Sequence, residues 1–482
     1  MSEKRYFKLL SSRHVKGEKN NYLVLFDVLD KAQEEDEIAI RKELMNKKIN
    51  VEFYSADKNY LYHQIIKSLN DFHFAKTYNL EIKEYLLSIE ILFHKGLYKE
   101  CTRLIDRAEK LAKKCENFPL LIDLLNWKKK CMGYSMGLSK ASEVNKEIES
   151  YLEILNNQKR ITDLYYQSYE LISKEEKIHD SETIQKLKRI LSQPEIKDEG
   201  KCLSFSARVF RKLIFSHFYL AVNEKRNELE MLHDLIEDLD QNEVYKEENP
   251  LDYISIFNRF LEIKKQFAND DFTDYIKKLK EFPKSVKIKK ETSEERVFIH
   301  CHTHEMEYYL LKNDYEKALQ KSKEIDKEIA RFKLNIEPFH LIYFYYSNAI
   351  ALLFLGENKK ALKFILNVLL KFKSSDRPQA YRRLELLYIL THFELGNSDL
   401  VESFSKKLLA EDKKDEILLP FEKLLMKSLL EILNSEKKKK NTKEENWKNL
   451  SLELQKEKTN SNPTYLNLLN NYQKWIELKS LK

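Results

Sequence analysis

The sequence predicts an all-α chain built as an α-solenoid of antiparallel helix pairs, and three observations favour this fold class. Seven glycines and eight prolines in 482 residues are too few for the frequent tight turns of a sheet or barrel. Four of the glycines form two pairs with nearly the same spacing: Gly96 and Gly137 are 41 positions apart, and Gly356 and Gly396 are 40 apart. A chain this long also exceeds what one closed core usually supports, so it splits into domains or grows in one dimension.

The repeated glycines mark turns between two helices. Gly96, Gly356 and Gly396 each follow an apolar run and open a second amphipathic run, and glycine reaches positive φ there without a Cβ clash. Asparagine and aspartate are the next-best residues at such turns. Intervals of 40–47 residues give eight turn positions, namely Gly96, Gly137, Asp180, Asn223, Asp270, Asn313, Gly356 and Gly396. We therefore expect a repeat array of about eight helix pairs over residues 76–434.

Three stretches after these turns share one spacing, in which a small residue is followed by apolar or small residues four and seven positions later. They are Tyr98, Cys101, Ile105 and Ala108; Tyr315, Ala318, Ser322 and Ile325; and Asn358, Ala361, Ile365 and Val368. This pattern resembles tetratricopeptide repeats, in a version with longer helices, and it is similar to bacterial repeat proteins from which no activity can be carried over. The resemblance implies a right-handed superhelix whose first helices line a concave groove. It is poor between residues 140 and 280, where Gln185, Glu228 and Tyr275 replace the small residue.

The two ends of the chain depart from the repeat. Helical patterns over Tyr22–Ala32, Glu35–Met45 and Lys58–Asn70 predict that residues 1–75 form an N-terminal helical cap or a small helical domain. Four consecutive lysines, 437–440, mark a solvated break. Residues 435–482 are therefore expected to hold this Lys-rich break and C-terminal helices that cap the last apolar face of the array.

Composition argues against several classes of partner and cofactor. The net charge of +7 comes from 85 basic and 78 acidic residues that are interleaved, and only 16 of the basic residues are arginine, so we expect no nucleic-acid partner. Five cysteines without a CxxC pair suit a reducing cytoplasm, and no apolar stretch is long enough to cross a membrane. Neither a glycine-rich phosphate loop nor HExxH is present, so we expect no cofactor and no catalytic residues.

His300-Cys-His-Thr-His304 is the stretch that most resembles a metal site. On a helix, His300 and His304 would share a face, but no second cluster supplies further ligands, so we expect no metal. The resemblance to tetratricopeptide repeats instead puts His300, and Glu307 two turns later, on a first helix that lines the groove.

A second candidate surface lies in the aromatic run 343–346. Aligning Gly356 with the turn position puts Tyr343, Tyr346, Ile350 and Leu353 on the concave side of their helix. Tyrosines combine apolar area with a hydrogen-bonding tip and are favoured in interfaces. The alternative is that all four are large core residues in a long helix.

The function expected from these features is a non-catalytic scaffold or adaptor that binds a protein or peptide in the concave groove. An alternative is a ligand-sensing regulator with an N-terminal DNA-binding head, although the helix over Lys58–Asn70 has only Lys58, His63 and Lys67 as basic groups. An enzyme on helical repeats is a third possibility without a supporting motif. Neither the identity of the partner nor the oligomeric state follows from the sequence.

Overall fold

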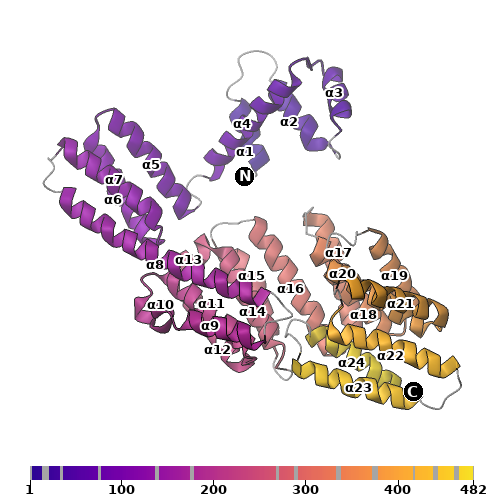
Figure 1. Ribbon diagram of the computed structural model, residues 1–482. Coiled ribbons are helices and arrows are strands. Elements are labelled where there is room, and N and C mark those ends of the chain that lie inside the picture. Colours follow the sequence, from indigo (N-terminus) through magenta and orange to yellow (C-terminus); the bar gives the residue numbers. More distant parts are fainter. Residues whose placement is uncertain are drawn as a thin grey trace. The chain divides into compact units, whose positions relative to one another are not determined.

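The computed structural model confirms the all-α fold class (Figure 1). It describes residues 3–12, 21–32, 36–73, 77–135, 141–173, 179–267, 271–286, 291–332, 338–371, 378–415, 418–437, 443–460 and 466–480. Every regular element within these ranges is helical, and no β-strand occurs there. By its internal contacts the chain divides into two compact units, Met1–Asn156 and Asn157–Lys482.

The first unit contains two groups of helices. Its elements are α1 (Glu3–Ser12), α2 (Asn21–Lys31), α3 (Glu37–Asn46), α4 (Tyr54–His73), α5 (Tyr78–His94), α6 (Tyr98–Lys114), α7 (Phe118–Ser135) and the first half of α8 (Ala141–Ser173). Helices α1 and α2 pack on α4, α3 packs on α2, and these four share one apolar cluster. Helices α5, α6 and α7 pack side by side around a second cluster (Figure 1). The three helices expected from the N-terminal sequence patterns correspond to α2, α3 and α4.

The second unit continues with the rest of α8 and sixteen further α-helices among its described residues. They are α9 (Ser181–Leu191), α10 (Pro194–Lys197), α11 (Phe205–Ala221), α12 (Lys225–Gln241), α13 (Glu243–Glu248), α14 (Pro250–Lys264), α15 (Thr273–Ser285), α16 (Glu291–Leu311), α17 (Tyr315–Phe332), α18 (Pro338–Phe354), α19 (Asn358–Lys371), α20 (Pro378–Glu394), α21 (Ser398–Asp415), α22 (Pro420–Lys437), α23 (Lys443–Asn460) and α24 (Leu466–Ser480). A short 3₁₀ helix, Glu199–Lys201, precedes α11.

Successive helices of the second unit pack against one another, and alternate helices also touch. Helix α14 packs on α16, α16 on α18 and α18 on α20, while α15, α17, α19 and α21 each pack on their sequence neighbours. We use the name first helices for α8, α11, α14, α16, α18, α20 and α22, because each opens a helix pair. Each first helix therefore buries its apolar stripe against neighbours along the chain, and the core extends from pair to pair.

The turn positions expected from the repeat are confirmed at five places. Gly96, Gly356 and Gly396 have φ of +73°, +73° and +75°, and Asn223 and Asn313 have φ of 59° and 63°. In the same turns the amide after the left-handed residue reaches back to the helix, as when Glu357 N donates to Leu352 O at 3.0 Å.

The remaining three turn positions have different outcomes. Asp180 lies between two helices as expected, but as the N-cap of α9, where its side chain accepts from Thr183 N at 2.6 Å. Gly137 and Asp270 lie outside the described residues.

The repeat pattern predicts that the small residue after each turn, and the positions four and seven residues later, lie on a buried helix face. Cys101, Ala318 and Ala361 are fully buried, and the apolar positions four and seven residues later are buried as well. At the weaker match Val401 takes the place of alanine and is also fully buried. No helix in the described part of the chain is at once long and apolar enough to cross a lipid bilayer.

We expect Gly356→Ala to lower the free energy of unfolding by about 1 kcal/mol, because an L-residue is strained at this φ. A Cβ at Gly356 would meet nothing within 4 Å, so the loss would come from the backbone alone. The matched control is Asn313→Gly at φ 63°, which should not lose stability. Urea unfolding followed by circular dichroism measures both, and equal losses in the two variants would contradict the turn assignment.

Candidate functional site

The residues expected to form a groove on α18 are buried in the structure. Tyr346, Ile350 and Leu353 are 4%, 1% and 6% exposed and belong to the large apolar cluster of the second unit. The Tyr346 hydroxyl donates to the Tyr472 hydroxyl of α24 at 3.5 Å. The side chain of Tyr343 lies outside the described residues. In this conformation a peptide could not reach these side chains, and the alternative of large core residues accounts for their burial.

The other two expected groove residues lie on α16. His300 is half-buried, and Glu307 is 6% exposed. Glu307 forms an ion pair with Lys265, the C-cap residue of α14, at 2.7 Å, and its carboxylate is 3.5 Å from His304 Nδ1. Burial acts to raise the pKa of Glu307, but the Lys265 ammonium and His304 hold it well below its usual range. Glu307 is therefore a buried structural partner in the structure rather than an exposed groove residue.

The histidines of the 300–304 run point to different partners. His302 Nδ1 is 2.9 Å from Glu305, whereas His304 Nε2 is 2.9 Å from Asn258 Oδ1. Glu262, His304 and Glu307 do come within 4.8 Å of one another, the spacing of a metal-binding group. However, the Lys265 ammonium is 2.5 Å from Glu262 and 2.7 Å from Glu307 and already neutralises these carboxylates.

A cavity of about 450 Å³ opens on three successive first helices, α8, α11 and α14. Its lining combines apolar and aromatic side chains with hydroxyl, imidazole, carboxyl and guanidinium groups. The lining consists of Tyr165, Tyr169, Ile172, Ser173, Val209, Phe210, Leu213, Ser216, His217, Leu220, Asp252, Ser255, Ile256 and Arg259. This volume and mixture are typical of a site for a small ligand or a few side chains of a peptide.

A buried ion pair fixes the cationic side of the cavity. Glu228 of α12 is 1% exposed, and its Oε1 accepts from Arg259 Nε and Nη2 at 2.9 and 2.6 Å. Ser216 Oγ donates to the same oxygen at 3.2 Å. Burial raises the pKa of Glu228, and the contacts with Arg259 and Ser216 oppose that rise. Arg259 also lines the cavity, and its third nitrogen, Nη1, is not used in the two hydrogen bonds to Glu228, so it is a candidate donor to a ligand.

His217 supplies a neutral acceptor to the same cavity. Its Nδ1 is 2.8 Å from the hydroxyl of Ser168, and that hydroxyl is 2.7 Å from the Tyr165 carbonyl. A hydroxyl has one proton, so Ser168 donates to the carbonyl and accepts from Nδ1–H, which leaves Nε2 as an acceptor. Burial, together with the positive charge of Arg259, lowers the pKa of His217 to about 3.

The Ser168–His217 pair resembles a nucleophile with its base, but its geometry does not suit catalysis. Ser168 is fully buried, and its proton is held by the Tyr165 carbonyl. His217 therefore acts as a donor to the serine rather than as a base that removes its proton. Asp252, whose pKa is raised by burial, accepts from the Tyr245 hydroxyl at 3.0 Å. The arrangement can bind a ligand through hydrogen bonds, and it does not assemble an activated nucleophile.

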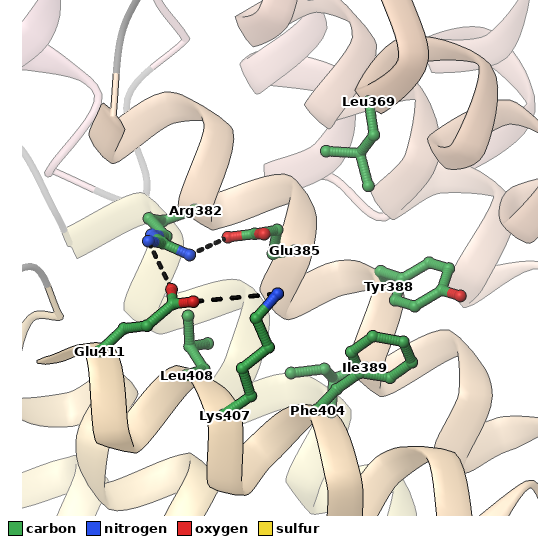
Figure 2. Close-up of a pocket in the computed structure, with 9 residues that line it drawn as sticks. All are labelled: Leu369, Arg382, Glu385, Tyr388, Ile389, Phe404, Lys407, Leu408 and Glu411. Atoms are coloured by element: carbon green, nitrogen blue, oxygen red, sulfur yellow. Dashed lines mark hydrogen bonds and ion pairs between the residues drawn. The ribbon is translucent and has the colours of Figure 1, made fainter. Parts of the chain in front are cut away.

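A second, smaller cavity of about 190 Å³ lies between α19, α20 and α21 (Figure 2). Its charged end is already neutralised within the protein, because Arg382 contacts Glu385 and Glu411 at 2.6 Å each. Figure 2 also shows Lys407 reaching Glu411, at 3.8 Å. These groups join α20 to α21 and leave little unsatisfied polarity for a ligand.

Sequence reasoning did not identify the larger cavity, although one signal for it was present. Glu228 occupies the position where the repeat pattern has a small residue, and the pattern alone shows it only as a poor match. A carboxylate at a close helix contact requires a buried partner, and Arg259 supplies it from the next first helix. The other departures are less informative, because Gln185 is exposed and Tyr275 packs on Phe260 with ring centroids 4.8 Å apart.

No protein-family model matches this chain, and no curated protein matches its sequence.

Removing one partner of the buried pair should destabilise the second unit strongly. We expect Glu228→Ala and Arg259→Met each to lower the free energy of unfolding by about 3 kcal/mol, because each leaves a desolvated charge without its partner. The free energy of unfolding of the double variant should fall by much less than the sum of the decreases in the two single variants. Urea unfolding of all four proteins measures this, and additive losses would show that the pair is not coupled.

Stability should also depend on pH through His217. The folded-state pKa of about 3 lies below the ordinary value of 6.5, so between these values the unfolded chain binds the extra proton and stability falls as pH is lowered. From pH 6.5 to pH 4.5, we expect the free energy of unfolding of wild type to fall by about 2–3 kcal/mol more than that of His217→Gln. Urea unfolding of both proteins at both pH values measures this. If wild type and His217→Gln lose the same stability over this range, burial does not lower the pKa of His217.

Proposed function

We propose that this chain is a non-catalytic scaffold or adaptor, built as a tetratricopeptide-like α-solenoid, that binds a peptide segment on the layer of first helices. The cavity on α8, α11 and α14 is the observation that carries the proposal. It opens on the layer that lines the concave groove in solenoids of this kind, and the next first helix, α16, packs on α14. A groove of this type recognises an extended segment by repeated side-chain contacts.

The cavity's polar groups suit a peptide amide. Arg259 Nη1 is placed to donate to a carbonyl oxygen, and His217 Nε2 is placed to accept from an N–H group. The aromatic wall of Tyr165, Tyr169 and Phe210 suits an apolar or aromatic side chain next to that amide. Because Glu228 balances the charge of Arg259, the cavity favours a neutral polar group over a bare carboxylate.

The alternative of a DNA-binding head remains a prediction. The exposed basic groups of α4 in the described structure are Lys58, His63 and Lys67, the same three that the sequence offers. No arginine joins them on that helix, so the basic surface stays small for a recognition helix.

The test is a selection of peptides from a phage-displayed library of random dodecapeptides on the full chain. We expect enriched peptides to carry an aromatic or large apolar residue. Their affinity should fall at least tenfold, or about 1.4 kcal/mol, in Ser255→Trp, because Ser255 is exposed at the cavity and an indole there would block it. Fluorescence anisotropy with synthetic versions of the peptides measures the change.

A matched control introduces the same indole elsewhere. Glu230 is exposed on α12 and does not line the cavity, so Glu230→Trp should bind like wild type. Peptides that bind both tryptophan variants equally, or a library that yields no enriched peptide, would contradict the proposal.

A further inference from the structure

The last described helix, α24, packs against helices that come far earlier in the second unit. Its Tyr472 contacts Tyr346 of α18 through the two hydroxyls and lies 6.0 Å, ring to ring, from Phe421 of α22. Its Trp475 lies 5.7 Å from Phe393 of α20. One helix therefore touches three successive first helices, whereas a cap that only continues the array would touch the last pair.

Polar and charged side chains of α24 make further contacts with α17, α18 and α20. Glu394, at the end of α20, accepts from Trp475 Nε1 at 2.6 Å and forms an ion pair with Lys479 at 2.5 Å. The Lys474 ammonium lies over the rings of Tyr315 and Phe354, at 5.2 and 5.5 Å from their centroids. The contacts of α24 thus run from the α17–α18 end of the layer to the end of α20.

The apolar stripe of α24 fits the spacing of an amphipathic helix that lies in a groove. Leu469, Tyr472 and Ile476 are buried at intervals of three and four residues, in the same cluster as Tyr346, Ile350 and Leu353 of α18. Tyr346, which the sequence placed on a binding surface, is therefore in contact with a segment of the chain itself. Helix-in-groove recognition uses the same pattern of anchors.

The contact combines tyrosine, tryptophan and an ion pair, which are residue types and interactions that are common in protein interfaces. It also holds a buried acceptor without a hydrogen-bond partner among the described residues, Glu422 Oε1 of α22. Burial raises the pKa of Glu422 to about 7. A buried acceptor that lacks a hydrogen bond weakens the closed contact.

We propose that Tyr346, Phe393, Glu394 and Phe421 form a helix-binding site that the chain fills with α24, and that a partner helix of the same chemistry takes its place. Such a partner carries two aromatic residues three positions apart and a lysine four residues after the second, as do Tyr472, Trp475 and Lys479. This site is separate from the cavity on α8, α11 and α14, and it does not depend on the function proposed for that cavity.

The tether gives α24 an advantage over any separate helix. A segment joined to its site by a short link competes at an effective concentration in the millimolar range. A free copy of α24 should therefore bind the unmodified chain weakly and bind well once the tethered helix is weakened. This difference distinguishes an exchangeable helix from a permanent part of the core.

The probe is a fluorescein-labelled synthetic peptide of residues 466–480, and its anisotropy is measured with four full-length chains. We expect the chain with Trp475→Ala and Lys479→Ala to bind the peptide at least tenfold more tightly than wild type, because its groove side is unchanged. Adding Glu394→Gln to that chain should weaken the binding again. The matched control is Leu478→Ala, which alters an exposed residue of the same helix and should bind like wild type.

A permanent core helix gives a different set of results. If the double variant keeps its helical circular dichroism and still does not bind the peptide, the proposal is overturned. Hydrogen–deuterium exchange of the wild-type chain provides a measurement that needs no variant: α24 should exchange at least tenfold faster than α22. Equal protection of the two helices would overturn the proposal even if the variants failed to fold.

Discussion

The second unit depends on pairing the charges that it buries between neighbouring helices. Glu228 of α12 is matched by Arg259 of α14, and Lys265 near the end of α14 is matched by Glu307 of α16. Each charge would be strongly unfavourable without its partner, so these contacts fix which faces of α12, α14 and α16 meet. The same constraint shapes the cavity, because Arg259, which lines it, is held to Glu228 by two of its nitrogens.

Much of the fold could be predicted from the sequence because its signals are local. A positive φ at Gly96, Asn313 or Gly356 depends on the residue itself and on the helix that ends there, and the glycines and asparagines reveal it. The buried register after each turn follows from helical periodicity, as at Ala318 and Ala361. These features require no knowledge of which distant segment covers which face.

The candidate sites could not be predicted because their neighbours are distant in the chain. Ser168 meets His217 from 49 residues away, and Tyr346 meets Tyr472 across 126 residues. A signal for the second contact was nevertheless present: α18 is apolar on nearly all sides, and a helix of that kind is covered on all sides. The repeat alignment placed Tyr346 on the concave face of its helix, and in the structure Tyr472 of α24 contacts Tyr346.

The two candidate sites differ in how far their side chains are already engaged by contacts within the protein, and this difference decides how each site can bind a ligand. In the cavity, the Ser168 hydroxyl and Glu228 hold His217 and Arg259 in place while leaving Nε2 and Nη1 available, so a ligand can add contacts without displacing any. At the α18–α22 face, Glu394 and the aromatic rings are already engaged by α24. A ligand there gains only the difference between its own contacts and those of α24. Binding at the cavity is therefore governed by the ligand alone, whereas binding at the α18–α22 face is governed by competition with a segment of the chain itself.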